Sequence, residues 1–192
     1  MPTPNPDAAR FLANRRSRPA KLFSAPTPSR DQLRAILTAA TRVPDHGKLE
    51  PWRLVVIEKP GMARLADLAE ARAIAMGGDA EKIAKGRGQY DLGQLAVVVV
   101  ASPKVSDKIP PVEQLLSAGA LCFGILNAAE AAGWGANWLT GWPAYDREFI
   151  ATAFGCAPHE TVAGIVHIAT AATDGGDRPR PDLDRLITWA DT

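Results

Sequence analysis

Apolar positions recur along this chain with two different periods, which predicts helices interleaved with strands. Helical spacing of apolar residues predicts helices over 7–14, 31–41, 62–76, 112–132 and 145–154. Short runs rich in Val and Ile predict strands over 53–58, 95–101, 136–139 and 161–170. The stretch 79–93 has a weaker pattern and is expected to form a short basic helix followed by a loop. This alternation indicates an α/β or α+β fold in which helical layers cover a sheet.

Two of these elements lack a polar face, and each is expected to be buried. The strand over 95–101 is a continuous apolar run, which is typical of a strand covered on both faces. The helix over 112–132 carries no charged residue between Glu113 and Glu130. A helix of this kind lies either in the centre of the molecule or at a subunit interface.

Composition places the chain among ordinary globular proteins. Its 192 residues are 46% hydrophobic and 22% charged, which fits a single domain over 1–192 with a core large enough to fold unaided. The 22 Lys and Arg residues against 21 Asp and Glu residues leave no basic excess for nucleic-acid binding. The first residues lack the apolar stretch of a secretion signal, and no apolar run reaches the length of a membrane span. We therefore expect a cytoplasmic protein that binds neither nucleic acid nor membrane.

Cysteine and histidine residues are too scattered to indicate a metal site. Cys122 and Cys156 stand far apart and form no Cys-x-x-Cys pair, so both are expected to be buried free thiols. The three histidines, His46, His159 and His167, are also far from one another. His167 falls within a strand pattern and is expected to be a hydrogen-bonded core residue. We predict no bound metal.

The segment Arg15-Arg16-Ser17-Arg18 is the strongest chemical signal in the chain. Guanidinium groups grip phosphate oxygens through paired donors, and a serine hydroxyl adds another donor. Taken alone, the segment is more readily a solvated basic turn at the end of a helix. A second segment changes that balance, because about one helix later the chain carries Pro44-Asp45-His46 in a turn that runs to Pro51-Trp52.

In this order and spacing, the two segments resemble the nitroreductase family of FMN flavoproteins. Members open with a helix, an Arg-Arg-Ser segment and a second helix, and a Pro-rich turn ending in Pro-Trp then leads into the first strand. Later segments also match: Gly133-Trp134-Gly135, Trp138-Leu139-Thr140-Gly141, Phe154-Gly155 and the strand around 164–169. The resemblance covers nearly the whole chain. It is closest to the short, minimal branch of the family, which carries Pro-Asp-His in the turn.

The resemblance implies a three-layer α+β fold in which a mixed sheet has helices on both faces. It also implies an intertwined homodimer in which the tail over 174–192 crosses to the partner subunit. The implied activity is reduction of nitroaromatic, quinone or related small acceptors by a ping-pong mechanism, with tightly bound, non-covalent FMN and with NADH or NADPH as electron donor. No catalytic side chain is expected, because N5 of FMN exchanges the hydride. No G-x-G-x-x-G follows a strand, so the nicotinamide would bind only transiently at the flavin.

The resemblance assigns residues to the phosphate end of the FMN site. Arg15 and Ser17 would bind the phosphate, and Arg16 would reach the ribityl chain and the N1–C2 edge of the ring. Arg178 and Arg180 would bring further charge to the phosphate, although a solvated Pro-Arg linker is an equally good interpretation of these two residues.

Other residues are assigned to the ring end. Arg42 and His46 would contact the flavin from the neighbouring subunit, although a histidine in such a turn can also be a surface cap. Backbone at Trp138, Leu139 and Thr140 would pass beside the ring. Leu139 stands where the minimal branch tends to carry Arg, which puts a side-chain role at this position in doubt.

Several interpretations remain open from the sequence. The basic cluster Lys82, Lys85 and Arg87 is either a solvated face or a contact for the phosphates of a nicotinamide donor. The chain could also be a non-catalytic flavin carrier or sensor. A third alternative is a flavoenzyme of the same fold with different chemistry, such as reductive dehalogenation or dehydrogenation. If the resemblance misleads, a soluble α/β domain without cofactor remains.

Overall fold

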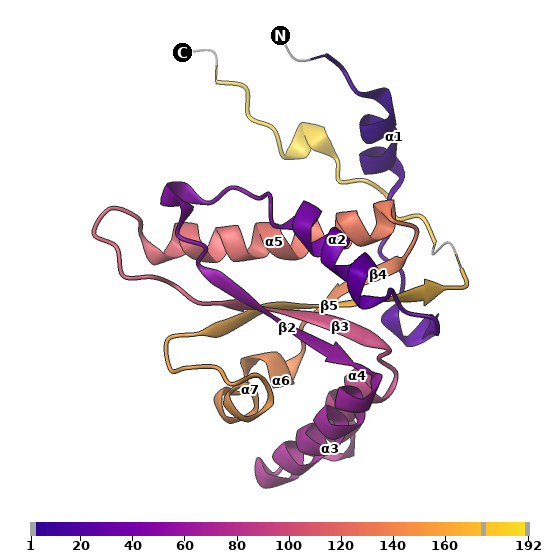
Figure 1. Cartoon of the computed structure of the whole chain (residues 1–192), viewed down its shortest axis with the longest axis vertical. Coiled ribbons are helices and arrows are strands. Elements are labelled where there is room, and N and C mark those ends of the chain that lie inside the picture. The colour runs from indigo at the N-terminus through magenta and orange to yellow at the C-terminus, as the bar shows by residue number, and fades with distance from the viewer. Residues whose placement is uncertain (1–2, 174–175, 191–192) are drawn as a thin grey trace.

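A sheet of five strands separates two helical layers (Figure 1). The computed structural model describes residues 3–173 and 176–190. The strands are β1 (Phe23–Ser24), β2 (Trp52–Glu58), β3 (Leu95–Ala101), β4 (Gly135–Leu139) and β5 (Thr161–Ala171). The helices are α1 (Pro6–Asn14), α2 (Arg30–Ala40), α3 (Lys59–Ala75), α4 (Ala80–Asp91), α5 (Pro111–Ala131), α6 (Trp142–Tyr145) and α7 (Arg147–Phe154). Short 3-10 turns cover Ala20–Leu22, His46–Lys48 and Leu183–Arg185.

Each face of the sheet has its own core. Val98 of β3 and Ile165 of β5 point into the core beneath α3 and α7, whereas Val97 and Val166 point into the core beneath α2 and α5. Figure 1 shows α2 and α5 on one side of the sheet and α3, α4, α6 and α7 on the other. As predicted, β3 is buried along its whole length, because helices cover both of its faces.

The predicted three-layer α+β fold is confirmed, but one detail of the sheet differs. Within the described residues every strand pair is antiparallel, so the expected mixture of parallel and antiparallel pairing is wrong. The reason lies in the connection from β2 to β3. Helices α3 and α4 pack against each other and return the chain to the end at which β2 stops, so Glu58 pairs with Leu95. A helix pair thus replaces the single crossover helix that parallel strands need.

Two helices begin differently from the prediction. Helix α3 begins at Lys59, before the predicted start at 62, and Pro60 lies in its first turn, where proline is well tolerated because its missing N–H would be unpaired anyway. The stretch 79–93 contains one full helix, α4, and not a short helix with a loop. Asp79 caps α4 by accepting a hydrogen bond from the backbone N–H of Lys82. The capping box between Ser29 and Gln32 at the start of α2 is present.

Helix α5 is long and apolar enough to cross a membrane by length and composition alone, and 44% of its most apolar window is buried within the molecule. One side of α5 packs on β3, β4 and β5, with Leu121 and Ile125 completely buried. The apolar character of that side is therefore explained by the core. The other side leaves Leu115, Leu116 and Phe123 exposed.

Candidate functional site

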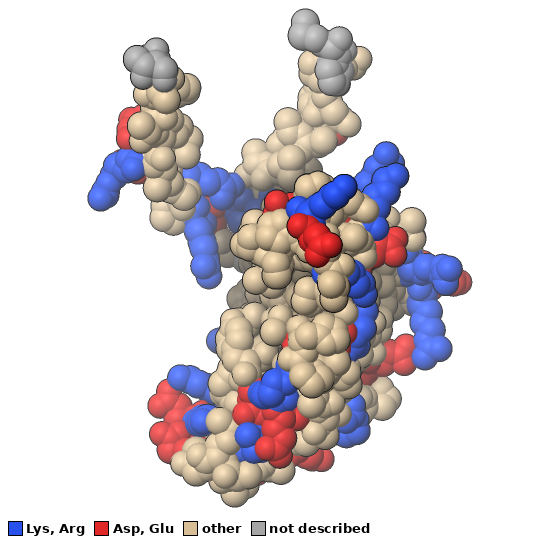
Figure 2. Space-filling model, turned by 90° about the vertical axis from the view of Figure 1, so that its left-hand side faces the viewer, with Lys and Arg blue, Asp and Glu red and all other residues tan. Residues whose placement is uncertain are grey.

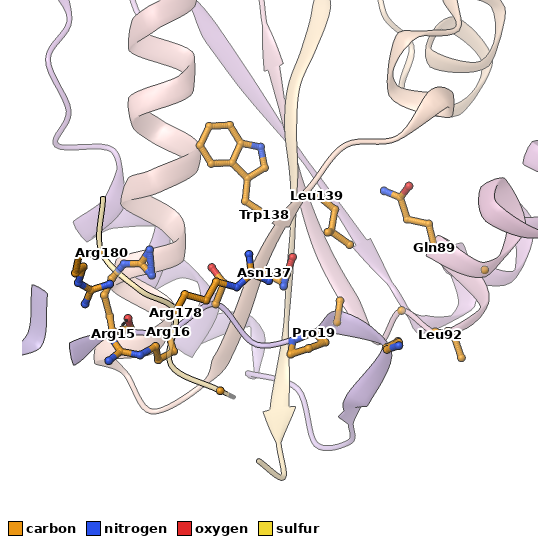
Figure 3. Close-up of a pocket in the computed structure, with 16 residues that line it drawn as sticks. Arg15, Arg16, Pro19, Gln89, Leu92, Asn137, Trp138, Leu139, Arg178 and Arg180 are labelled. Atoms are coloured by element: carbon orange, nitrogen blue, oxygen red, sulfur yellow. Dashed lines mark hydrogen bonds between the residues drawn. The ribbon is translucent and has the colours of Figure 1, made fainter. Parts of the chain in front are cut away.

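The cavity that contains the predicted arginines, termed the main cavity, lies where the chain after α1, the end of α4, strand β4 and the C-terminal tail meet (Figure 3). Its volume is about 640 Å³. It is lined by Arg15, Arg16, Ser17, Pro19, Ala20, Lys21, Gly88, Gln89, Leu92, Gly93, Asn137, Trp138, Leu139, Gly176, Arg178 and Arg180. Seven of these residues belong to the predicted site: Arg15, Arg16, Ser17, Trp138, Leu139, Arg178 and Arg180.

The segment over 15–18 is fixed between the end of α1 and strand β4. The backbone N–H of Arg15 donates to the carbonyl of Phe11 at 2.8 Å and ends the helix. Asn137 of β4 then donates from Nδ2 to the carbonyl of Arg18 at 2.6 Å. The N–H of Arg18 donates to the carbonyl of Ala136 at 3.3 Å. Because the backbone N–H and the carbonyl of Arg18 are both hydrogen-bonded to β4, the Arg-Arg-Ser segment has a defined position at the cavity wall.

Basic side chains from two ends of the chain meet at this wall. The guanidinium of Arg16 forms an ion pair with Asp177 at 2.7 Å, and its side chain is 20% exposed. Arg180 donates a short hydrogen bond to the carbonyl of Ala13. Arg15 stacks over the Phe123 ring of α5, with 5.3 Å between Cζ and the ring centroid. Figure 2 shows basic side chains gathered where the terminal segments join the body of the molecule. Such a group of guanidinium donors is suited to a phosphate.

The opposite end of the cavity is less charged. Figure 3 shows Arg15, Arg16, Arg178 and Arg180 together at one end, and Gln89 and Leu92 of the α4 terminus at the other. Asn137 and Leu139 lie between the two ends. They pair with His167 and Ile165 of β5, so their side chains lie on the same face of the sheet as those two side chains. The cavity is therefore cationic at one end and mostly apolar with amide groups at the other.

Trp138 lies on the other face of β4, because its partner Val166 points into the core beneath α5. The indole packs directly over Gly164 of β5. A Cβ atom added at Gly164 would lie 2.0 Å from Nε1 of Trp138, so this position accepts only glycine unless the ring moves. The Trp138 side chain is still 39% exposed.

Three predicted site residues do not line the cavity of this single chain. Arg42 follows the end of α2, and Thr140 follows the end of β4. Nδ1 of His46 lies 2.7 Å from Oε2 of Glu113 at the start of α5. The resemblance assigned Arg42 and His46 to the neighbouring subunit's flavin, and that assignment stays a prediction.

Sequence reasoning missed Pro19, Ala20, Lys21, Gly88, Gln89, Leu92, Gly93, Asn137 and Gly176. Gln89 to Gly93 belong to the stretch with the weakest pattern. Asn137 alone carried a usable signal, since it is a polar residue inside an apolar strand next to Trp138.

Two residues of the basic cluster of α4, Lys85 and Arg87, are engaged in ion pairs. Arg87 contacts Asp67 at 2.8 Å and Asp91 at 2.9 Å, and it also contacts Glu70. These carboxylates raise the pKa of Arg87. Lys85 pairs with Glu81 at 2.6 Å. These pairs favour a solvated structural face over a contact for nicotinamide phosphates.

His167 is buried as predicted, with 1% exposure. The expectation that it would be hydrogen-bonded is wrong, since neither ring nitrogen has a partner among the described residues. Burial lowers the pKa of His167 to about 4, so the imidazole is neutral at pH 7. Cys122 and Cys156 are buried free thiols, as expected. Among the described residues, no three His, Cys, Asp or Glu side chains gather as a metal site would require.

Comparison with known proteins agrees with this fold. The family model described as "Nitroreductase family" matches residues 12–170. A protein of Escherichia coli K12 named "Putative NAD(P)H nitroreductase YdjA" is 36% identical over 164 residues, which cover 85% of this chain and 88% of that protein. A Haemophilus influenzae protein named "Putative NAD(P)H nitroreductase" is 35% identical over 167 residues, with the same coverage of 85% and 88%.

Solved structures match the fold at lower identity. A nitroreductase-like protein from Bacillus cereus superposes with a TM-score of 0.80 at 20% identity, over 100% of both chains. The FMN- and NADPH-dependent nitroreductase NfnB of a Sphingopyxis strain (TM-score 0.75, 19% identity) covers 96% of this chain and 99% of its own. A protein from Desulfovibrio desulfuricans described as a "putative nitroreductase in complex with FMN" has a TM-score of 0.73 at 21% identity over 99% of both chains. Fold, family model and relatives thus agree with the resemblance seen in the sequence, and the chain belongs to the nitroreductase family.

Proposed function

We propose that this chain is an FMN-dependent oxidoreductase that uses NADH or NADPH to reduce nitroaromatics, quinones or related small acceptors. The observation that carries the proposal is the polarity of the main cavity, which gathers Arg15, Arg16, Arg178 and Arg180 at one end and is also lined by Ser17. FMN has the same polarity, with a dianionic phosphate at one end and a flat, largely apolar ring at the other.

The phosphate end fits FMN by its donor chemistry. Arg15 and Ser17 would bind the phosphate oxygens, and Arg178 and Arg180 would add charge from the tail. Arg16 would reach the ribityl chain and the N1–C2 edge. The cavity holds about 640 Å³, which is within the usual range for a cofactor site.

The ring end offers apolar walls and a few polar groups. Leu139 and Leu92 would exclude water from the ring, and backbone at Trp138 and Thr140 would pass beside it. The amides of Gln89 and Asn137 have both donors and acceptors for the polar edge of a pyrimidine ring. Lys21 also lines this cavity and adds a cation to it.

FMN, when bound, supplies hydride exchange at N5, first with the nicotinamide and then with the acceptor in a ping-pong sequence. The chain's own residues are then needed to bind, orient and shield the cofactor, and none acts as a catalytic acid or base. The names of the E. coli and H. influenzae relatives and the FMN-containing D. desulfuricans structure support this assignment.

The functional unit in this proposal is a homodimer. Leu115, Leu116 and Phe123 on α5 and Trp189 in the tail are large apolar side chains left exposed by the single chain, and Trp189 is 80% exposed. An apolar surface of this kind is typical of a subunit interface. The tail would cross to the partner, and Arg42 and His46 would reach the partner's flavin. Residues 174–175 and 191–192 of that tail lie outside the described residues. The two buried free thiols suit a reducing compartment, so we place the enzyme in the cytoplasm.

The test is an absorbance spectrum of the purified protein, followed by anaerobic titration with NADH and NADPH. We expect a flavin spectrum that bleaches with either donor and recovers when a quinone or nitroaromatic is added. Heat-released cofactor should run as FMN on HPLC, at about one per chain. A colourless protein that cannot be reconstituted would contradict the proposal. A flavin that neither donor bleaches would indicate a carrier or sensor.

A further inference from the structure

We propose that Glu130 of α5 is a positioning residue for FMN, which holds Arg15 from behind in the orientation that the phosphate requires. The inference rests on the proposed function, because it concerns how this chain prepares its phosphate site. Glu130 does not line the main cavity, so it acts through the arginine and not on the cofactor.

Arg15 and Arg16 form a wall with two sides. One side faces the main cavity, and the other faces a smaller hollow of about 480 Å³. That hollow is lined by Asp7, Arg10, Phe11, Asn14, Arg15, Arg16, Arg18 and Glu130. Glu130 is therefore behind the arginines as seen from the cavity, with Asp7 and Arg10 of α1 as the other charged groups of the hollow beside the three arginines.

The charged form of the Glu130 carboxyl group is disfavoured by desolvation and by incomplete hydrogen bonding. Its Oε1 atom is shielded from solvent and has no hydrogen-bond partner among the described residues. Burial raises the pKa of Glu130, whereas the charges of Arg15 and Arg18 and the backbone of Arg16 pull in the other direction. A buried acceptor that is left incompletely paired destabilises the fold. The position is therefore better explained by a role in orienting arginines than by a contribution to stability.

Helix α5 offers Arg15 a second contact on the same side. Phe123 lies about two helical turns before Glu130, so the two side chains share one helix face. The Phe123 ring is 5.3 Å from Cζ of Arg15, which is within range of a cation–π interaction. Phe123 thus stacks on the Arg15 guanidinium, and Glu130 adds a carboxylate to the hollow that Arg15 also lines. Fixing a long side chain in advance removes part of the entropy lost when the ligand binds.

This role predicts two effects of opposite sign for Glu130→Gln. The substitution removes a poorly solvated charge, so the thermal stability of the FMN-free protein should stay the same or rise. It also removes the attraction that orients Arg15, so FMN affinity should fall. If Glu130 only stabilised the fold, its substitution would lower both the thermal stability and the FMN affinity.

The experiment compares Glu130→Gln with Glu148→Gln in the full-length protein. Glu148 is 70% exposed and pairs with Arg72 on α3, away from the cavity. Dissociation constants for FMN and riboflavin are measured by calorimetry, and melting temperatures are measured without flavin. For Glu130→Gln we expect FMN binding at least tenfold weaker, riboflavin binding changed less than twofold, and no fall in melting temperature. Glu148→Gln should change none of the flavin constants.

A double-mutant cycle tests whether Glu130 acts through Arg15. In an Arg15→Ala background, Glu130→Gln should change FMN affinity less than twofold. A full tenfold loss in that background would contradict positioning of Arg15. Equal losses for FMN and riboflavin, or tighter FMN binding by Glu130→Gln, would overturn the proposal as well.

Two further outcomes are assigned in advance. If Glu130→Gln does not fold, Glu130→Asp keeps the charge on a shorter side chain and should weaken FMN binding at least threefold without affecting riboflavin; unchanged FMN binding would refute the role. If the wild-type protein binds no FMN, the proposed function itself fails, which is a different result from a wild type that binds FMN and a variant that binds it equally well.

Discussion

Arg16 and Asp177 form an ion pair of 2.7 Å at the cationic end of the cavity, where the proposed phosphate would lie. The two partners differ in exposure, since the Arg16 side chain is 20% exposed and that of Asp177 is 72% exposed. A carboxylate offers a guanidinium the same kind of paired oxygens as a phosphate. Asp177 therefore places a negative charge next to Arg16, so it competes with an incoming phosphate for this cationic end of the cavity, and it can leave into solvent when displaced.

Asp177→Asn should consequently tighten FMN binding. An exposed ion pair contributes about 0.2–1 kcal/mol, so its removal corresponds to about a 1.4- to 5-fold gain in affinity. Riboflavin, which lacks the phosphate, should bind as before. Asp184→Asn, a carboxylate elsewhere in the tail, is the matched control. Weaker FMN binding in Asp177→Asn would mean that Asp177 helps to order the site and does not compete for it.

Arg15→Ala should weaken FMN binding by about 2–4 kcal/mol, because it removes a charge-assisted donor that is partly buried in the cavity wall. Riboflavin affinity should change far less. Arg10→Ala provides a control with the same change in net charge, since Arg10 lies on α1 and pairs with Asp7 on the surface. Equal losses for FMN and riboflavin would show that Arg15 does not bind the phosphate.

The arginine wall could be predicted from the sequence because its chemistry is contiguous. Arg15, Arg16 and Ser17 are consecutive, so their meeting required no knowledge of the fold. The ring end could not be predicted in the same way. Gln89 lies in α4, whose sequence includes Gly86 and Gly88, both poor helix formers. Glycine is needed at position 86 because the Trp142 ring packs against it. A Cβ atom added there would lie 2.5 Å from Cζ2 of that ring.

Relationships between strands were also beyond the sequence. Trp138 lines the cavity, but its dependence on Gly164 follows only from the register of β4 on β5. The same register places Asn137 beside His167. A residue whose contacts depend on how two strands are aligned leaves no periodic pattern in the sequence. Helices α2 and α5, in contrast, were predictable from capping and apolar patterns.

Gly164→Ala should destabilise the protein by about 1–3 kcal/mol, because the added methyl group collides with the Trp138 indole in a well-packed sheet. Urea denaturation of the FMN-free protein measures the change, and tryptophan emission should report displacement of the ring. Gly88→Ala is the control: nothing lies within 4 Å of a Cβ atom added there, so it should stabilise α4 by about 0.5–1 kcal/mol. Equal stability of Gly164→Ala and wild type would show that the ring moves aside at no cost.

His46→Ala should lower the reduction potential of bound FMN if His46 reaches the partner's flavin. A donor near N1 stabilises the negative charge of the reduced ring, and loss of one hydrogen bond corresponds to about 10–30 mV for a two-electron couple. Potentiometric titration with measured flavin occupancy provides the test. Glu113→Gln, which removes the 2.7 Å contact of His46 within its own chain, separates the two roles. Unchanged potential and occupancy in His46→Ala would leave His46 as a residue of its own turn.

His167 should make the protein sensitive to mild acid. Its pKa is lowered to about 4 by burial, compared with about 6.5 in an unfolded chain. Between these two values the unfolded chain binds more protons than the folded protein, so the free energy of unfolding should fall as pH falls through this window. The loss at pH 5 is about 2 kcal/mol for this one group. Glu130, a half-buried carboxyl with a pKa raised by desolvation, works in the opposite direction.

His167→Leu removes the titrating group from the core and should flatten the acid side of the stability profile. We expect its free energy of unfolding in urea to fall by about 2 kcal/mol less than that of wild type between pH 7 and pH 5. The comparison uses the slope and not the absolute stability, because leucine also changes packing beside Gly93, where an added Cβ atom would lie 3.3 Å from Cε1 of His167. His159→Gln, in an exposed turn, should leave the slope of wild type unchanged. Parallel profiles for His167→Leu and wild type would mean that the folded protein accommodates a protonated His167, through water or through movement of the end of α4.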